Sequence, residues 1–549
     1  MEAFLIANMA PIMFASLVVV LLLGYPVAFA LAFNGLLWGV IGISLGLFHP
    51  TFFQALPERI FGVMGNETLL AVPFFTFMGL ILERSGMAEE LLETVGQLFG
   101  PIRGGLAYAV IFVGALLAAT TGVVAASVIA MGLISLPIML RYGYDRRLAT
   151  GVIAASGTLA QIIPPSLVLI VMADQLGKSV GDMYEGAIVP GLVLSALYAG
   201  YVLIVTIVRP KAAPALPKEF RTLRGGALLL RVIVALIPPL ILIFLVLGTI
   251  FIGVATPTEG GAMGAVGALV LAALKRRLSL QVVKQALDST LKLSAFVLFI
   301  LIGSRVFSLT FYGVDGHVWV ESLLTSLPGG ELGFLIVVNL LVFVLAFFLD
   351  FFELAFIVVP LVGPAAAHLG IDLIWFGVLL GINMQTAFMH PPFGFSLFYL
   401  RSVAAKAPYK DRVTGRMTAP VTTGQIYWGA VPFVCIQIVM IGLTIAFPGM
   451  VMRYQDVDRE HQAPPAQIET QPSGGPDFNT GQPNFGAPPA SAPESGEPAA
   501  PNFGTAPAPA PAPSGSEAPS DGPNFGSQPT PPASGDEAPA GPNFGSPSG

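Results

Sequence analysis

Oxygen-bearing side chains interrupt four otherwise apolar stretches of this 549-residue sequence. Their hydroxyl, amide and carboxylate oxygens suit a hard cation such as Na⁺ far better than a soft metal. Ionisable groups in apolar segments are expensive to bury and therefore indicate function. The four groups, together our predicted sodium ligands, are Thr120, Thr121 and Gly122; Ser156, Gly157 and Thr158; Asp350, with Glu353 nearby; and Asn383, Gln385 and Thr386.

A proline pair follows two of these groups and predicts a break in each helix. The pairs lie in "SGTLAQIIPPS" and "NMQTAFMHPPFGF". Proline removes a backbone donor and clashes with the preceding turn, and in lipid the freed carbonyls have no water to bind. Such carbonyls and half-helix ends can coordinate a cation, and the helix N-termini can face an anion. The residues that we assign to these breaks or to substrate binding are Pro164, Pro165, Ser166, Glu353, Pro391 and Pro392.

Structural roles compete with these assignments. Serine and threonine are ordinary at helix contacts in membranes, so each one taken singly is also consistent with packing. Asp350 is also consistent with a satisfied structural carboxylate or with a position at the lipid interface, and the same holds for Glu353. His390 could shuttle protons, but the sequence favours a histidine that packs between helices. Thr256, Pro257 and Glu259 have the spacing of a helix capping box.

Composition places these groups in a polytopic, all-α membrane protein. Hydrophobic residues make up 54% of the chain and charged residues 11%, and the mean hydropathy is +0.78. Apolar runs long enough to span hydrocarbon predict ten to thirteen membrane segments and no cleaved signal peptide. The single cysteine excludes an internal disulfide framework. No hydrolytic, nucleotide-binding or redox motif is present, so we predict no enzyme activity, no cofactor besides the coupling ion, and lipid rather than nucleic acid as a partner.

An internal repeat relates the two proline pairs, which lie 227 residues apart. The same offset matches Pro137 to Pro364, Gly143 to Gly370, Asp145 to Asp372 and Ala160 to Ala387. Basic residues precede the first break ("RYGYDRR") but follow the second (Arg401 to Arg416). Because cytoplasmic loops collect lysine and arginine, the two copies are predicted to cross the membrane in opposite senses. Inverted repeats with matching breaks are typical of secondary transporters.

These signals predict four parts of the chain. Residues 1–208 form the first half, with a hairpin near 104–140 and a broken helix near 148–173, and 209–231 form a basic cytoplasmic linker. Residues 232–453 form the second half, with a hairpin near 333–364 and a broken helix near 373–400. The tail, 454–549, is rich in Pro, Gly and Ala, is acidic, and repeats "PNFG" four times. We predict that it is disordered and lies on the outer side of the membrane. It would act there either as a spacer or as a docking segment.

The motifs also resemble a known family over about residues 1–450. They include "NETLLAVPFFTFMGLILERSGMAEELL", "TPTEGGAMG" and the long run from "LDFFELAF" to "PPFGFSLFYLR". They are similar to the large, DctM-like membrane subunit of tripartite ATP-independent periplasmic (TRAP) transporters. The resemblance implies an elevator-type, inverted-repeat transporter of the bacterial inner membrane with two re-entrant hairpins and two unwound helices. It also implies Na⁺-coupled uptake of organic acids, a small four-helix membrane subunit and a periplasmic substrate-binding protein.

Transferred onto this chain, the resemblance places the hairpin tips at Thr120–Gly122 and Phe348–Glu353. The unwound helices become Ser156–Ser166 and Asn383–Gly394. The first tip departs from the Ser-Gly-Ser-like pattern of many family members. The second tip and "QTAFMHPPFGF" resemble a branch linked to 2-oxo acids and related monocarboxylates, with C4-dicarboxylates as the other substrate class. The alternatives are a stand-alone sodium/carboxylate symporter and, more distantly, an anion channel, a membrane scaffold or a membrane-embedded enzyme.

Overall fold

The structure is a computed structural model that describes residues 2–453 except 218, 220, 222–224 and 412–413. The chain divides into the units Met1–Ala466 and Gln467–Gly549, and the description below concerns the first. The predicted tail at 454–549 lies outside the described residues. Within them the fold is helical apart from one two-stranded antiparallel ribbon, β1 (Tyr409–Lys410) and β2 (Met417–Thr418).

Long apolar helices dominate, as the composition predicts. Among the described residues, seven helices are long and apolar enough to cross a membrane, or up to ten if each bent pair counts as one span. This confirms a polytopic helical protein, at the low end of the predicted ten to thirteen segments. The helices before the first hairpin are α1 (Glu2–Ala7), α2 (Met9–Leu22), α3 (Val27–Ser44), η1 (Phe52–Ala55), α4 (Leu56–Met64), α5 (Glu67–Arg84) and α6 (Met87–Phe99).

The first half then forms a helical hairpin and a broken helix. The hairpin, which we call the first hairpin, consists of α7 (Gly105–Thr121) and α8 (Val124–Arg141). The broken helix runs through α9 (Arg146–Thr158), the 3-10 turn η2 (Leu159–Gln161) and α10 (Leu167–Leu176). We call residues 159–166 the first break. Helix α11 (Val180–Val208) follows.

The second half repeats this order. The second hairpin consists of α17 (Gly330–Leu345), α18 (Phe351–Ile357) and α19 (Val359–His368). Its broken helix comprises α20 (Leu373–Met384), the 3-10 turn η5 (Gln385–Phe388) and α21 (Phe395–Val403), with residues 385–394 as the second break. The other helices of this half are α12 (Gly225–Ile243), the π-helical turn η4 (Phe244–Gly248), α13 (Thr249–Phe251), α14 (Pro257–Leu274), α15 (Leu280–Gly313), α16 (Gly316–Thr325) and α22 (Thr423–Ala446).

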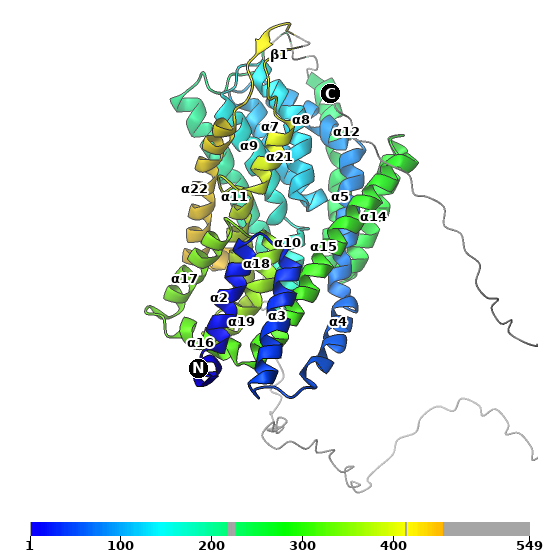
Figure 1. Cartoon of the computed structure of the whole chain (residues 1–549). Coiled ribbons are helices and arrows are strands. Elements are labelled where there is room, and N and C mark those ends of the chain that lie inside the picture. Colours follow the sequence, from blue (N-terminus) through cyan, green and yellow to red (C-terminus); the bar gives the residue numbers. More distant parts are fainter. Residues whose placement is uncertain (1, 218, 220, 222–224, 412–413, 454–549) are drawn as a thin grey trace, which may run out of the picture. The chain divides into compact units, whose positions relative to one another are not determined.

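Equivalent elements begin and end at the offset found in the sequence. Helices α8 and α19 end 227 residues apart, and so do α10 and α21. Asp145 and Asp372 cap α9 and α20 by accepting hydrogen bonds from the backbone amides of the first turn. The peptide bond within each proline pair is cis. The two hairpins enter this unit from opposite ends, α7 and α8 from the top of Figure 1 and α17 and α19 from below.

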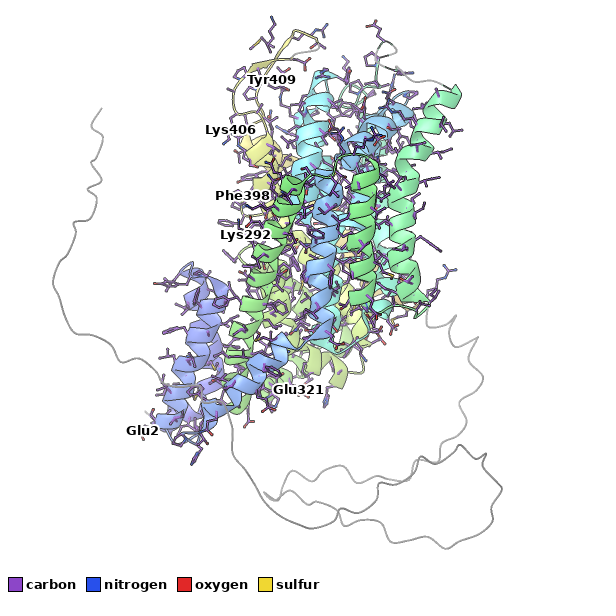
Figure 2. The ribbon with its side chains drawn as sticks, turned by 90° about the vertical axis from the view of Figure 1, so that its right-hand side faces the viewer. Glu2, Lys292, Glu321, Phe398, Lys406 and Tyr409 are labelled. Atoms are coloured by element: carbon purple, nitrogen blue, oxygen red, sulfur yellow. The ribbon has the colours of Figure 1, made fainter. Side chains whose placement is uncertain are left out.

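One end of this unit is basic. The base of the first hairpin is tied there to the loop after α21, because Arg141 Nε lies 2.8 Å from Asp411 Oδ2. At the same end, the Asp145 amide donates to the Ala212 carbonyl at 2.8 Å and an Arg401 guanidinium nitrogen donates to a backbone carbonyl at 2.7 Å. Figure 2 shows Lys406 at this end. The three basic segments of the sequence therefore converge.

The opposite end carries carboxylates. His368 at the end of α19 meets Glu321 of α16, with Nδ1 2.9 Å from Oε1. Figure 2 shows Glu321 far from Lys406. Loops that collect lysine and arginine at one end are typical of the cytoplasmic side of a membrane protein.

Two details of the sequence analysis can be compared with local structure. The capping box at the start of α14 is confirmed, because Thr256 Oγ1 accepts from the Glu259 amide and Glu259 Oε2 accepts from the Thr256 amide at 2.8 Å. The predicted linker, 209–231, overlaps the start of a helix. Helix α12 already begins at Gly225, because an apolar run starts directly after it, so 225–231 belong to that helix.

Candidate functional site

A cavity of about 280 Å³ lies where both hairpin tips and both breaks meet. The first tip contributes Gly122, and the second contributes Asp350. Gln161 comes from the first break and Phe388 from the second. The remaining lining residues are Val123, Val124, Ala125, Leu167, Leu293, Phe296, Phe351, Phe352, Phe395 and Tyr399. Segments more than 200 residues apart in sequence thus share one chamber.

Helix N-termini surround this cavity. Helices α8, α10 and α21 begin at Val124, Leu167 and Phe395, and each of these residues lines the cavity. The first turn of a helix leaves backbone N–H groups without intrahelical partners and carries a partial positive charge. Three such ends favour an anionic ligand, whereas the N-terminus of α18 at Phe351, which also lines the chamber, is capped by the Asp350 carboxylate. Among the described lining residues none is lysine or arginine.

Aromatic side chains form an apolar part of the cavity wall. Phe296, Phe352 and Tyr399 line the chamber together with Phe388 and Phe395. The rings of Phe388 and Phe395 have centroids 5.9 Å apart, so the wall is continuous there. A ligand with a charged group and an apolar body is compatible with both surfaces.

The second hairpin tip is organised by a capping box. Asp350 Oδ1 accepts from the Glu353 amide at 2.8 Å, and Glu353 Oε2 accepts from the Asp350 amide at 2.9 Å. Asp350 is therefore a structural carboxylate that caps α18, and the same residue also lines the cavity. The D-x-x-E spacing was a signal for this cap, as T-x-x-E was for α14.

The first tip is a tight turn against the first break. Gly122 ends α7 with φ of +58°, the left-handed region that favours glycine. A Cβ at this position would lie 3.3 Å from the carbonyl oxygen of Pro165. Thr120 is buried and its hydroxyl donates to the Leu117 carbonyl at 3.0 Å, which is a helix-internal contact. The side chain of Thr121 lies outside the described residues.

The predicted residues of the first broken helix are fully buried beside the cavity. Ser156, Gly157 and Thr158 end α9, which packs on α8 so closely that a Cβ at Gly157 would meet Val128. Ser166 begins α10 as its N-cap, and its hydroxyl also donates to the Gln161 carbonyl. Thr158 and Ser166 thus lie on either side of the break that contains Pro164 and Pro165.

The second broken helix is held by amide contacts. Asn383 donates to the backbone carbonyl and the side-chain oxygen of Asn339 in α17, at 2.7 and 2.9 Å. The Thr386 hydroxyl donates to the Asn383 carbonyl at 2.7 Å. His390, beside Pro391 and Pro392, packs between aromatic rings, with its centroid 4.1 Å from that of Phe347. This is the packing role that the sequence favoured.

The end of α9 touches the start of the second break at the equivalent position of the repeat. Gln385 Nε2 donates to Thr158 Oγ1 at 3.0 Å, and these residues are 227 apart, the repeat offset itself. Both side chains are fully buried. The contact therefore lies at the centre of the pseudo-symmetric arrangement.

Several buried oxygens near the breaks lack hydrogen-bond donors. They are Ser156 Oγ, Asn383 Oδ1, Gln385 Oε1 and Gln161 Oε1. An unsatisfied buried polar atom costs about 1–3 kcal/mol, so such atoms call for a partner such as an ion or water. Hydroxyl and amide oxygens are the donor type that a hard cation takes. The residues present thus fit Na⁺ as a transported ion.

The predicted residues differ in how they lie relative to the cavity. Gly122 and Asp350 line the cavity, whereas Ser156, Thr158, Asn383, Gln385 and Thr386 lie buried beside it. Gln161 lines the cavity, is 1% exposed, and both of its amide atoms lack partners, but it is not among the residues predicted from the sequence. Its polar type inside an apolar break was the available signal.

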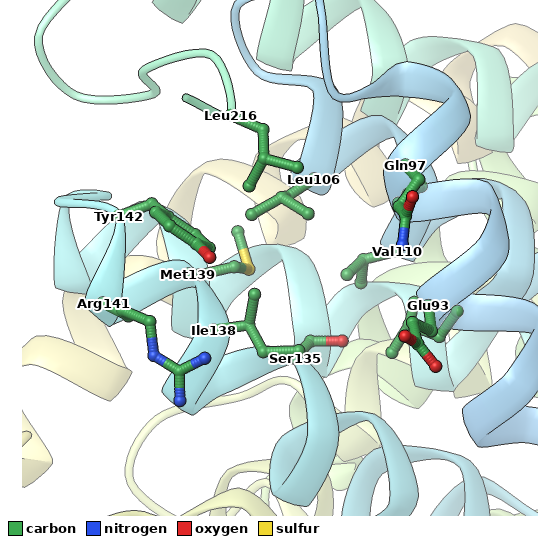
Figure 3. A pocket seen from close by; sticks show the side chains of 13 residues that line it. Glu93, Gln97, Leu106, Val110, Ser135, Ile138, Met139, Arg141, Tyr142 and Leu216 are labelled. Carbon is green, nitrogen blue, oxygen red and sulfur yellow. The ribbon is translucent and has the colours of Figure 1, made fainter. Parts of the chain in front are cut away.

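A second cavity, of about 150 Å³, lies away from the predicted residues. It is bounded by α6, α7 and α8 near the basic end, and Figure 3 shows Glu93 and Gln97 on one side and Tyr142 and Met139 on the other. None of the predicted site residues lines it. The candidate binding site is therefore the cavity between the hairpin tips and the breaks.

Comparison with known proteins identifies a family to which the sequence is similar. A model of the tripartite ATP-independent periplasmic transporter DctM component matches residues 14–450. The C4-dicarboxylate TRAP transporter large permease protein DctM of Pseudomonas aeruginosa is 32% identical over 362 residues, covering 66% of this chain and 83% of that protein. The sialic acid TRAP transporter large permease protein SiaM of Vibrio cholerae is 28% identical over 69% of this chain and 86% of its own length. Among solved structures, the Alcanivorax borkumensis YdaH transporter gives a TM-score of 0.49 at 14% identity, covering 73% of this chain and 89% of that chain.

Proposed function

Because this chain belongs to the DctM component family of the TRAP transporters, we propose that it is the translocation subunit of a sodium-coupled importer of small organic acids. It is a transporter permease rather than an enzyme, and a multi-pass protein of the inner membrane. The observation that carries the proposal is the single chamber lined by both hairpin tips and both breaks.

The substrate of this proposal is a monocarboxylate with an apolar body, such as a 2-oxo acid. Three helix N-termini offer backbone N–H groups to one carboxylate, and Gln161 offers an amide donor. The aromatic wall suits an apolar body, and the absence of lysine and arginine from the described lining leaves no cationic partner for a second carboxylate. The two relatives are named for C4-dicarboxylates and for sialic acid, which are also acids.

Sodium is the coupling ion of the proposal. The donor-less oxygens of Ser156, Asn383 and Gln385 are uncharged ligands, and Asp350 supplies a negative charge at the second tip. Bound Na⁺ would offset the carboxylate of Asp350 and so reduce its repulsion of an anionic substrate. Cation and anion would then bind the same chamber cooperatively.

Movement of the substrate requires the chamber to open alternately to each side. We assign this to the two hairpins acting as re-entrant gates and to an elevator displacement of hairpins and broken helices against the outer helices. The pairs α3 with α15 and α5 with α14 pack against each other and form part of that outer frame. The partners in this proposal are a small four-helix membrane subunit and a periplasmic binding protein that delivers the acid.

Uptake into proteoliposomes tests the proposal. The full chain is reconstituted with its small subunit, and labelled pyruvate and succinate are offered with and without the periplasmic binding protein under an inward Na⁺ gradient. We expect uptake of the monocarboxylate only when Na⁺ and binding protein are both present. Uptake without the binding protein would establish a stand-alone symporter, and uptake independent of Na⁺ would refute the coupling.

A further inference from the structure

A cavity of about 390 Å³ lies at the basic end of this unit, where the start of α9, the end of α11 and the start of α22 come together (Figure 1). It shares no lining residue with the chamber between the hairpin tips and the breaks. Two arginines line it, Arg147 in the first turn of α9 and Arg209 directly after α11. This cavity is therefore separate from the site assigned to the transported acid.

Backbone hydrogen bonds hold the two arginines at this cavity. The Arg209 carbonyl accepts from the Ala212 amide at 2.8 Å, and the Ala212 carbonyl accepts from the Asp145 amide at 2.8 Å. The segment after α11 is therefore tied to the residue that caps α9. Helix α22 packs on the start of α9 so closely that a Cβ at Gly429 would lie 2.3 Å from the Arg147 carbonyl oxygen. The two cationic side chains thus belong to one fixed pocket.

The positive charge of this cavity lacks a counter-ion from the described part of the chain. Neither arginine forms an ion pair with a described residue. Asp145 is the one carboxylate among the described lining residues, and its Oδ1 accepts from the amides of Arg147 and Leu148 at 2.8 and 3.3 Å. Two guanidinium groups against one carboxylate leave one excess positive charge. The lining therefore favours an anion.

Apolar side chains continue from the arginines onto the outer surface of the helices. Ile204 and Val208 line the cavity and are 61% and 70% exposed, and Trp428 beside them in the lining is 64% exposed. They belong to α11 and α22, which are both long and apolar enough to cross a membrane. Tryptophan gathers at membrane–water interfaces, and basic pockets between transmembrane helices on the cytoplasmic side suit anionic lipid headgroups.

We propose that this cavity binds an anionic phospholipid, with its phosphate between Arg147 and Arg209 and an acyl chain along Ile204 and Val208. Guanidinium groups present paired N–H donors that match phosphate oxygens. A free phosphate would use the arginines and leave the apolar wall uncovered, so a lipid accounts for more of the lining. The bound lipid joins α9, α11 and α22 and stabilises their packing. The inference does not depend on sodium coupling.

Native mass spectrometry of the full chain with its small subunit tests the site. Phosphatidylglycerol and phosphatidylcholine with the same acyl chains are titrated separately, and we expect one phosphatidylglycerol to bind with the lower dissociation constant. One arginine near an anionic lipid contributes about 1 kcal/mol, so Arg147→Gln and Arg209→Gln should each raise that constant about fivefold. Phosphatidylglycerol should also raise the melting temperature of the wild type more than that of either variant. Both side chains are exposed, so both variants should fold, and if one does not, the other decides.

The matched control is Lys406→Gln, which removes a cation from the same end of the molecule but outside the cavity (Figure 2). Its dissociation constant for phosphatidylglycerol should stay within twofold of wild type. Equal losses in Lys406→Gln and the arginine variants would indicate general attraction to the basic end and overturn the site. Equal affinity for the two lipids, or the same stabilisation by inorganic phosphate alone, would overturn it as well. Binding to the large subunit alone but not to the complex would mean that the small subunit covers this cavity, and it would also contradict the proposal.

Discussion

Asp350 combines two roles that substitutions can separate. Its carboxylate caps α18 and also lines the chamber. Asparagine caps helices as well as aspartate does, so Asp350→Asn keeps the cap and removes only the charge. Asp350→Ala removes both, and the lost cap costs about 1 kcal/mol of stability. The two variants therefore distinguish a coupling carboxylate from a purely structural one.

The charge effect is the larger of the two. A carboxylate about 5 Å from a bound Na⁺ contributes roughly 3 kcal/mol at an effective dielectric constant of about 20. Even if half of this is offset by solvation of the free ion, its loss changes the Na⁺ affinity about tenfold. We therefore expect Asp350→Asn to raise the Na⁺ concentration for half-maximal uptake at least about tenfold.

The assay is Na⁺ activation of uptake at constant ionic strength, with expression and melting temperature measured alongside. Thr256→Ala is the matched control, because it removes the cap of the equivalent box at α14, away from the chamber. It should leave Na⁺ activation unchanged. Wild-type Na⁺ activation in Asp350→Asn, together with destabilisation in Asp350→Ala, would refute the electrostatic argument and leave the residue as a cap.

Three further substitutions test the packing that positions the site. Gly122→Ala should slow uptake and destabilise the first tip by about 1–2 kcal/mol, because alanine is strained at φ of +58°; unchanged kinetics would contradict the tight turn. Arg141→Met should lower stability by about 3 kcal/mol in thermal unfolding, because it leaves the carboxylate of Asp411 buried without its cation, and adding Asp411→Asn should restore part of the loss. Gly151→Ala should lower the free energy of unfolding by at least about 2 kcal/mol, because its Cβ would lie 2.1 Å from a backbone oxygen of α22. Its control is Gly200→Ala on α11, which has open space around it and should leave the free energy of unfolding unchanged or slightly higher.

Features dictated by single residues could be predicted from the sequence. The predicted breaks coincide with the interruptions at Pro164–Pro165 and Pro391–Pro392, although a proline pair alone does not decide the matter, because Pro238 and Pro239 lie inside α12. Charge alone does not define where a helix begins, so the predicted linker overlaps the first residues of α12. Features that need tertiary contacts were not accessible. Tyr198 and Gln437 lie on separate apolar helices, and nothing in either local sequence pairs them.

The contact between Thr158 and Gln385 shows why the two halves need not serve the ion equally. Equivalent positions meet there, but one half supplies a hydroxyl and the other an amide, so the hydrogen bond has a direction. The amide donates and keeps its oxygen free, whereas the hydroxyl is saturated by its neighbours. The second half therefore retains the donor-less oxygens of Gln385 and Asn383, and the first half retains that of Ser156 in α9. A repeat that began symmetric would in this way bind cations with unequal strength on its two sides.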